Sequence, residues 1–153
     1  MQLTPSTAEI YLRHAFGQML RVAERVGDER VNERPLGSDT NAIAALIIHC
    51  CSVSDFWFGH VALGHPNRRD REAEFSRTAT VAELHQIVDD AVSTALTDIR
   101  ALEAGEGKDE GGRQFLPGGD GSDGAVVLHV LEECFQHLGH MELAADALRA
   151  DRR

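Results

Sequence analysis

Residues 41–63 read Asn41-Ala-Ile-Ala-Ala-Leu-Ile-Ile-His49-Cys-Cys-Ser-Val-Ser-Asp55-Phe-Trp57-Phe-Gly-His-Val-Ala-Leu63. The first half of this stretch is apolar on nearly every side of a helix, so it predicts a helix buried in the centre of the protein. Gly64 and Pro66 follow it and are typical of a helix end. The N-cap is predicted at one of three polar residues that precede the helix, namely Ser38, Asp39 and Thr40.

Three other segments carry apolar residues at helical spacing. They span residues 8–26, 81–102 and 124–149. Gly27 predicts the end of the first segment. Thr80 and Glu83 have the spacing of a capping box at the start of the second.

Four amphipathic helices of about 20 residues favour an all-α fold, and a four-helix bundle is the architecture expected. Long polar connections separate the helices, at residues 28–40, 65–79 and 104–123. Connections of this length allow a crossover, so a simple up-down-up-down order does not follow. Residues 1–153 are expected to form a single domain.

Composition limits the classes of function. Of the 153 residues, 42% are apolar and 26% are charged, which is typical of a globular domain. The net charge of -10 repels phosphate backbones, so no nucleic-acid partner is expected. The sequence has no run of about 18 uncharged apolar residues, so no membrane-spanning helix is expected. The first residues do not resemble a signal peptide, and three cysteines without a Cys-x-x-Cys motif predict no disulfide framework, so a cytoplasmic protein is expected.

The last helical segment contains a cluster of metal-ligand residue types, His129-Val-Leu-Glu-Glu133-Cys-Phe-Gln-His137-Leu-Gly-His140-Met-Glu142. Steps of four, four and three residues place three histidines and one glutamate along one helix face. Glu133 and His137 lie one turn apart, so they can coordinate one ion together. A carboxylate paired with an imidazole suits zinc, nickel or iron.

The third proposed ligand is His49, in the most apolar run of the chain. Inward side chains of two packed helices meet at a bundle axis, where metal sites are built. Three protein ligands, His49, Glu133 and His137, leave a coordination position open, as in catalytic sites. His140 and His129 are candidates for a further ligand or a proton shuttle, and exposed helix polarity is their alternative interpretation. A lone buried histidine such as His49 is also often only hydrogen-bonded in the core.

Three stretches together resemble the DinB/YfiT-like metalloenzymes, and most closely the branch of the mycothiol-dependent maleylpyruvate isomerase N-terminal domain and related thiol S-transferases. They are Asn41-Ala-Ile-Ala-Ala-Leu-Ile-Ile-His49, Val53-Ser-Asp55-Phe56-Trp57 and Glu132-Glu133-Cys-Phe-Gln-His137-Leu-Gly-His140. The resemblance implies a four-helix bundle that holds a divalent metal, usually zinc, at His49, Glu133 and His137. It also implies mycothiol as the thiol, and it allows a homodimer.

Two departures from that branch are present; the first favours a single-domain transferase over an isomerase, and the second removes an arginine that would contact an anion. The isomerase has a further C-terminal domain, whereas this sequence stops at Arg153, soon after the last helix. Relatives also often have an arginine about five residues after the last motif histidine, where this chain has Ala145.

The expected function is metal-dependent thiol S-transfer, in which a metal-bound thiolate of mycothiol attacks an electrophile. His140 is the candidate proton-transfer residue. Trp57, beside Phe56, and Arg68, in the cluster Arg68, Arg69 and Arg71, are candidates for binding the cofactor or substrate. Asp55 is a candidate acceptor that orients a ligand histidine, and placement on the helix surface is its alternative interpretation.

Three alternatives belong to other classes. A zinc-dependent hydrolase would use Glu142 or His140 as acid or base. A non-catalytic protein would use the bundle for metal binding or dimerisation. A cysteine nucleophile, Cys51 or Cys134, is disfavoured because apolar surroundings raise the pKa of a thiol.

Overall fold

The computed structural model describes residues 3–108 and 111–150. Four long helices form most of the fold: α1 (Pro5–Val26), α2 (Ile43–Ser54), α4 (Val81–Glu103) and α5 (Asp123–Ala150). The shorter elements are the π-helix η1 (Asp55–Ala62), the helix α3 (Arg71–Ser76) and two 3-10 turns, η2 (Arg113–Phe115) and η3 (Pro117–Gly119). No strand occurs within these described ranges, and the expected all-α bundle is confirmed.

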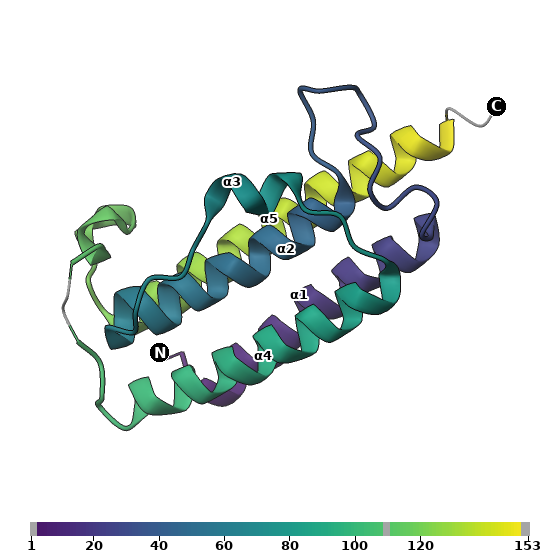
Figure 1. The fold of residues 1–153 in the computed structure, drawn as a ribbon. Coiled ribbons are helices and arrows are strands. Elements are labelled where there is room, and N and C mark those ends of the chain that lie inside the picture. The colour runs from purple at the N-terminus through teal and green to yellow at the C-terminus, as the bar shows by residue number, and fades with distance from the viewer. Residues whose placement is uncertain (1–2, 109–110, 151–153) are drawn as a thin grey trace.

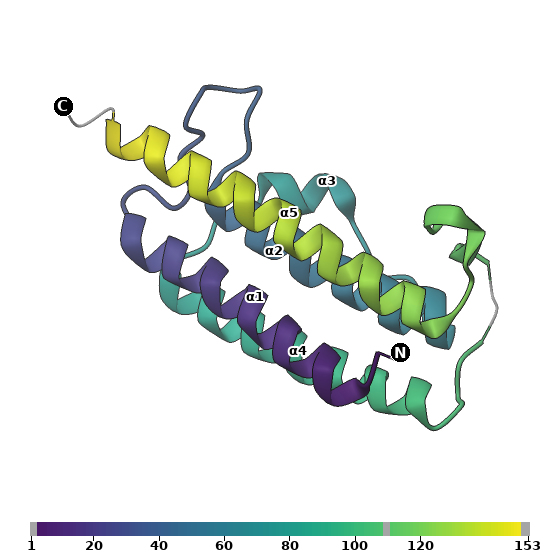
Figure 2. The ribbon, with the colours of Figure 1, turned by 180° about the vertical axis from the view of Figure 1, so that it is seen from behind.

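The helices are ordered with one crossover. In both views α1 lies beside α4 and α2 lies beside α5 (Figures 1 and 2). α1 and α5 run in one direction, and α2 and α4 run in the opposite direction (Figure 1). The connection between η1 and α4 therefore runs back along α2 before α4 begins, and this connection carries α3. The long connection makes the crossover possible, as its length predicted.

α1 begins at Pro5, three residues before the predicted start at residue 8. The Thr4 side chain accepts a hydrogen bond from the Thr7 amide at 3.1 Å, and proline at the first helical position needs no amide partner. Gly27 ends the helix as predicted, with a positive φ of 74° that favours glycine.

The start of α2 differs from the prediction. Ala42 occupies the N-cap and makes no side-chain bond, so the predicted cap at residues 38–40 is wrong. A backbone contact takes the place of a cap, because the Ala44 amide donates to the Val31 carbonyl at 2.9 Å. The helical path continues to Ala62 as predicted, but its last eight residues form the π-helix η1.

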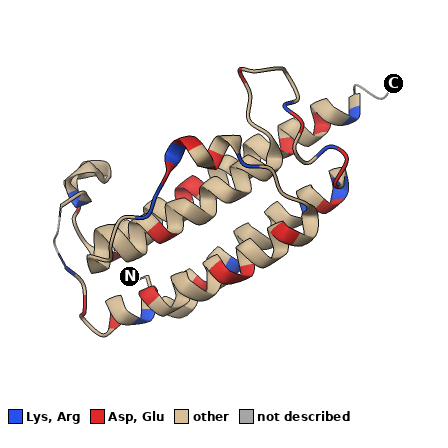
Figure 3. Cartoon of the chain, viewed as in Figure 1, with Lys and Arg blue, Asp and Glu red and all other residues tan. Residues whose placement is uncertain are grey.

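The central position of α2 follows from its composition. The helix has no charged residue, so its ribbon is tan in Figure 3. Charged residues, in red and blue, lie on the loops and on the surfaces of the other helices. The stretch Ile43–Ala62 is long and apolar enough to cross a membrane, with a mean hydropathy of 1.3. However, 72% of it is buried inside the bundle, which is typical of a core helix.

α3 is a helix that the sequence analysis missed, since residues 65–79 were expected to be a connection. Asp70 caps it by accepting a hydrogen bond from the Ala73 amide at 3.0 Å. The helix has only six residues, too few to show a helical repeat of apolar residues. It packs against α2 and so brings its own side chains to the middle of that helix (Figure 1).

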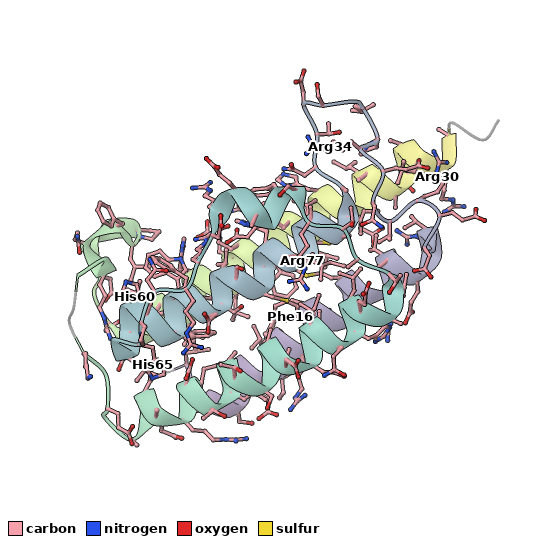
Figure 4. The ribbon with its side chains drawn as sticks, viewed as in Figure 1. Phe16, Arg30, Arg34, His60, His65 and Arg77 are labelled. Atoms are coloured by element: carbon pink, nitrogen blue, oxygen red, sulfur yellow. The ribbon has the colours of Figure 1, made fainter. Side chains whose placement is uncertain are left out.

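The two ends of the bundle differ in their surroundings. Figure 4 shows His60 and His65 at the end of the bundle where Lys108 and Gly112 lie against Ala62 and Val61 of η1. Arg30 and Arg34 lie at the opposite end, with the connection between α1 and α2, and Phe16 is buried in the core between them.

Candidate metal centre

His49 is buried near the middle of α2, with 4% of its surface exposed. Its two ring nitrogens face different partners. Nδ1 lies 2.7 Å from Oε2 of Glu74 on α3, and Nε2 lies 4.0 Å from Oε2 of Glu133 on α5. In the tautomer that carries its proton on Nδ1, the Glu74 carboxylate accepts that proton and Nε2 is the nitrogen that can bind a cation.

α5 supplies the other two groups. Glu133 and His137 are one turn apart, and Nε2 of His137 lies 3.5 Å from Oε2 of Glu133. The His137 ring meets the His49 ring edge to face, with 4.7 Å between the ring centres. One potential ligand atom from each of the three residues lies within 4.8 Å of the other two. The packing of α2 against α5 thus brings together the three residues that the sequence singled out.

The donor set fits a divalent transition-metal ion. Two imidazole nitrogens and one carboxylate oxygen are ligands of zinc, and a tetrahedral site with bonds of about 2.0–2.2 Å holds its ligand atoms roughly 3.3 Å apart. The two glutamate–histidine separations are 4.0 and 3.5 Å and all three groups lie within 4.8 Å, so binding of an ion would require the ligand atoms to move closer by up to about 1.5 Å. The Glu133 side chain is 30% exposed, so the group is open to solvent on one side.

The environment of His137 favours its neutral form. Burial lowers the pKa of this histidine below its ordinary value of 6.5, and the neighbouring His49 lowers it further, while Glu133 opposes the shift. A metal binds only unprotonated imidazole, so this shift keeps His137 available as a ligand at neutral pH.

Glu74 is a functional residue that the sequence analysis missed. It is 3% exposed and accepts from both His49 and Arg69, whose Nε lies 2.8 Å from Oε1. Although burial raises the pKa of Glu74, the hydrogen bonds from Arg69 and His49 hold it below its ordinary value. Arg69 in turn lies over the Phe56 ring, 5.4 Å from its centre. The carboxylate is therefore charged and fixed against His49.

The expectation that Asp55 orients a ligand histidine is wrong, because Glu74 occupies that position. Asp55 begins the π-helix and is exposed; its carboxylate lies near Gly59 and Asp98. The only feature of the sequence that indicated the helix carrying Glu74 was Asp70, a capping residue inside a polar stretch. Nothing in the sequence connected that stretch with His49.

The remaining histidines of α5 lie beside the three-residue group. His140 is exposed, and its Nδ1 lies 3.4 Å from Nδ1 of His137. His129 packs against Trp57, with 4.5 Å between the ring centres, and its Nδ1 lies 3.7 Å from Glu132. Trp57 is half-buried against the core. His140 therefore contacts the ring nitrogen of His137 that faces away from Glu133, whereas His129 belongs to the aromatic contact with η1.

The arginines of the crossover connection divide into two kinds. Arg69 is half-buried and bound to Glu74. Arg68 and Arg71 are exposed, and neither forms a hydrogen bond or ion pair with the described part of the chain. Their charges are thus available at the surface beside the residues that hold His49.

Two alternatives lose support from the geometry. Cys50, Cys51 and Cys134 are all buried as free thiols. A hydrogen bond with Cys134 and burial raise the pKa of Cys50, and burial raises the pKa of Cys51, so thiolate nucleophiles are disfavoured. Glu142, the proposed acid or base of a hydrolase, is paired with Arg25 of α1.

Comparison with known proteins finds one family whose model covers the candidate metal centre. A protein-family model described as Mycothiol-S-transferase matches residues 7–151, which include all three residues of the candidate metal centre. Neither the comparison with curated proteins nor the comparison with solved structures finds a match to this chain.

Proposed function

Because the chain belongs to the mycothiol S-transferase family, within the DinB/YfiT-like superfamily that its motifs predicted, we propose that it joins mycothiol, through its thiolate sulfur, to an electrophile. The observation that carries the proposal is the convergence of His49, Glu133 and His137 within 4.8 Å. In this proposal residues 1–153 act as one domain in the cytoplasm.

The three residues would hold a divalent ion, for which zinc is proposed. Such an ion lowers the pKa of a bound thiol, so that thiolate forms at neutral pH. Glu133 is the only charged member of the donor set. Its single negative charge leaves the site net positive when a dication is present, which favours an anionic sulfur over a neutral one.

The chain's own residues orient and deprotonate the thiol. Glu74 keeps the Nδ1 proton of His49 in place, so Nε2 stays directed toward Glu133. His140 is proposed as the proton-transfer residue, because it is exposed to solvent and its Nδ1 lies 3.4 Å from Nδ1 of His137, on the side of that ring away from Glu133. Trp57 is proposed as the apolar surface, and Arg68 as the cation, that bind the rest of the cofactor or substrate.

The ligand assignment is tested by metal content. Protein purified without an affinity tag is expected to hold about one zinc ion per chain by elemental analysis. His49→Ala and His137→Ala are expected to lose the ion, whereas His85→Ala, which removes a surface histidine paired with Glu24, is expected to keep it. Unchanged metal content in both ligand variants would reject the three-residue site.

The thiol assignment is tested by calorimetry on the zinc-loaded protein with mycothiol, bacillithiol and glutathione. Mycothiol is expected to bind with a dissociation constant well below millimolar and more tightly than the other two thiols. If none of them binds in that range, the transferase proposal fails. Turnover of an ester or amide without added thiol would favour the hydrolase instead.

A further inference from the structure

An apolar groove lies beside the candidate metal centre, at the end of the bundle where Figure 4 places Arg34. Its volume is about 360 Å³. One wall comes from the connection between α1 and α2, the other from the C-terminal half of α5, and the first turn of α2 forms the floor. The apolar side chains that line it are Pro35, Leu36, Leu46, Leu143, Ala144 and Ala147.

The groove carries no charged side chain, although the protein has a net charge of -10. Its polar lining groups are Thr40, Asn41 and two histidines of α5. Two leucines on opposite walls are left in solvent, since Leu36 is 75% exposed and Leu143 is 70% exposed. Exposed apolar surface gathered around a concave site is typical of a ligand-binding surface.

Hydrogen bonds within the first wall fix its shape. Thr40 accepts from the Leu36 amide at 3.2 Å and donates to the Gly37 carbonyl at 3.1 Å. Gly37 itself has a φ of 81°, which allows the tight turn. Arg34 donates to the Ser38 carbonyl at 2.8 Å. Leu36 is thus presented on a formed turn rather than on a free chain.

The groove is continuous with the metal centre, because His137 belongs to both. Its ring lines the groove, and its Nε2 lies 3.5 Å from Glu133. His140 also lines the groove, next to His137. A molecule held between Leu36 and Leu143 would therefore contact His137, one of the three proposed ligands, at one end of the groove.

We propose that this groove binds the electrophile, and that the electrophile is a small, uncharged, apolar molecule. The proposal rests on the proposed function and adds the class of acceptor to it. A charged acceptor would find no counter-ion among the lining residues and would lose its hydration there. A volume of about 360 Å³ is at the lower end of small-molecule sites, which favours an acceptor about as large as a substituted aromatic ring.

The transfer can be followed with 1-chloro-2,4-dinitrobenzene as the model acceptor. The thiolate sulfur forms a bond to the ring carbon that carries chlorine, and the carbon–chlorine bond breaks with its electron pair, which releases chloride. The thiol proton is released to solvent. No oxidant or reductant takes part, and the product absorbs light, so the reaction gives a direct rate.

The test compares two leucines of the same helix. Leu143→Asp places a charge in the groove, while Leu128→Asp places the same charge at a site that is 58% exposed and outside the groove. Leu143→Asp is expected to raise KM for the apolar acceptor about tenfold with kcat little changed, as loss of roughly one leucine contact predicts. Leu128→Asp is expected to match the unmodified protein.

A second measurement does not depend on catalysis. Binding of the uncharged fluorophore N-phenyl-1-naphthylamine is titrated without thiol, and Leu143→Asp alone is expected to weaken it about tenfold. Weakened binding in a protein that transfers no thiol would overturn the proposed function but support the groove as an apolar ligand site. Equal KM and equal fluorophore affinity in the two variants would overturn the groove proposal.

Self-association is the competing use of the same surface. Sedimentation of both variants separates it from acceptor binding. If Leu143→Asp converts a dimer into a monomer and leaves KM unchanged, the exposed leucines serve an interface between two copies, and the acceptor proposal is wrong. If the variant changes KM without changing the sedimentation coefficient, the acceptor proposal is supported.

Discussion

At the scale of single residues, Glu74 is the decisive side chain beside the three proposed ligands. A buried carboxylate is unfavourable unless it is paired, and Glu74 is paired twice, with Arg69 and with His49. Removal of either partner would leave a buried charge partly uncompensated. The same two hydrogen bonds fix the tautomer of His49. One residue thus couples the stability of α3 to the orientation of a ligand.

Substitution of Glu74 by glutamine tests this coupling. Glu74→Gln keeps the size of the side chain but removes its charge, so the Nδ1 proton of His49 loses its strong acceptor. We expect zinc affinity to fall about 10- to 100-fold, the range for partners that orient a ligand histidine. A chromogenic chelator in competition with the protein measures the affinity.

Glu72→Gln is the matched control, because Glu72 is an exposed residue of the same short helix. It should leave zinc affinity unchanged. If Glu74→Gln binds zinc as tightly as the control does, the carboxylate has only a packing role.

Asp98 is a second buried acid, on α4, and no hydrogen bond reaches its Oδ2 from the described residues. Burial raises the pKa of its carboxyl above the ordinary 3.8; His65 opposes the shift and Asp55 adds to it. The folded protein therefore binds this proton more tightly than the unfolded chain. The contribution of protonated Asp98 to the free energy of unfolding is present at low pH and is lost as the pH rises through the pKa of Asp98 in the folded state.

The pH dependence of stability follows with a definite sign. Asp98→Asn removes the ionised group, so the variant should be more stable than the unmodified protein at pH 7.5. The difference should shrink toward pH 4, because the raised pKa of Asp98 favours its protonated form as the pH falls. Urea unfolding at both pH values measures it, with the exposed Asp89→Asn on the same helix as the control. A constant difference at both pH values would contradict the assigned titration.

At the scale of elements, η1 changes the direction in which α2 continues. A π-helix has a wider turn than an α-helix, so residues after Ser54 are rotated away from the positions that an uninterrupted α-helix would give them. The rotated segment packs the Trp57 ring on His129 of α5. π-helical segments are frequent at functional sites, and this one begins six residues after His49.

The N-terminus of α4 is stabilised by a capping box, which confirms the predicted pairing of Thr80 and Glu83. Thr80 Oγ1 accepts from the Glu83 amide at 3.2 Å, and Glu83 accepts from the Thr80 amide at 2.7 Å. The Thr80 hydrogen bonds also lower the pKa of the Glu83 carboxyl. These bonds satisfy backbone groups that have no partner within the helix.

Thr80→Ala should therefore destabilise the protein by about 1 kcal/mol, the usual effect of a lost N-cap. For a chain of this size that corresponds to a decrease in melting temperature of about 2–4 °C. Calorimetry measures the change. Thr78→Ala, two residues earlier and exposed, is the control and should have little effect. Equal melting temperatures in the two variants would show that the cap does not limit stability.

At the scale of the whole molecule, the candidate metal centre joins parts that are distant in the sequence. His49 comes from α2, Glu133 and His137 come from α5, and Glu74 comes from α3 in the crossover. Only the folded state would bind an ion there, because the unfolded chain does not bring these groups together. Binding should therefore stabilise the entire bundle.

Removal of metal is expected to lower the melting temperature. At a free zinc concentration 100 times the dissociation constant, binding contributes about 2.7 kcal/mol, which corresponds to an increase of roughly 5–10 °C over chelator-treated protein. His137→Ala should show no such increase. Magnesium, which prefers oxygen ligands, should not replace zinc. An identical melting temperature with and without zinc would argue against a metal at this position.

The sequence by itself determined the number of long helices, the buried position of α2 and the spacing of Glu133 and His137. These features depend on local periodicity, which a single segment carries in its own residues. The capping box at Thr80 and the glycine stop at Gly27 are local in the same sense. The start of α2 was not predictable, because a backbone contact from Val31 replaces the side-chain cap.

Only the tertiary structure decided which groups meet. The approach of His49 to α5 depends on how two helices pack, and the contact with Glu74 depends on a six-residue helix that leaves no periodic pattern. The same cause explains why the partner of His49 is Glu74 and not the predicted Asp55. The groove beside His137 likewise exists only because the connection at Pro35 and Leu36 folds against α5. Such contacts join residues far apart in the chain, and no local pattern encodes their distance.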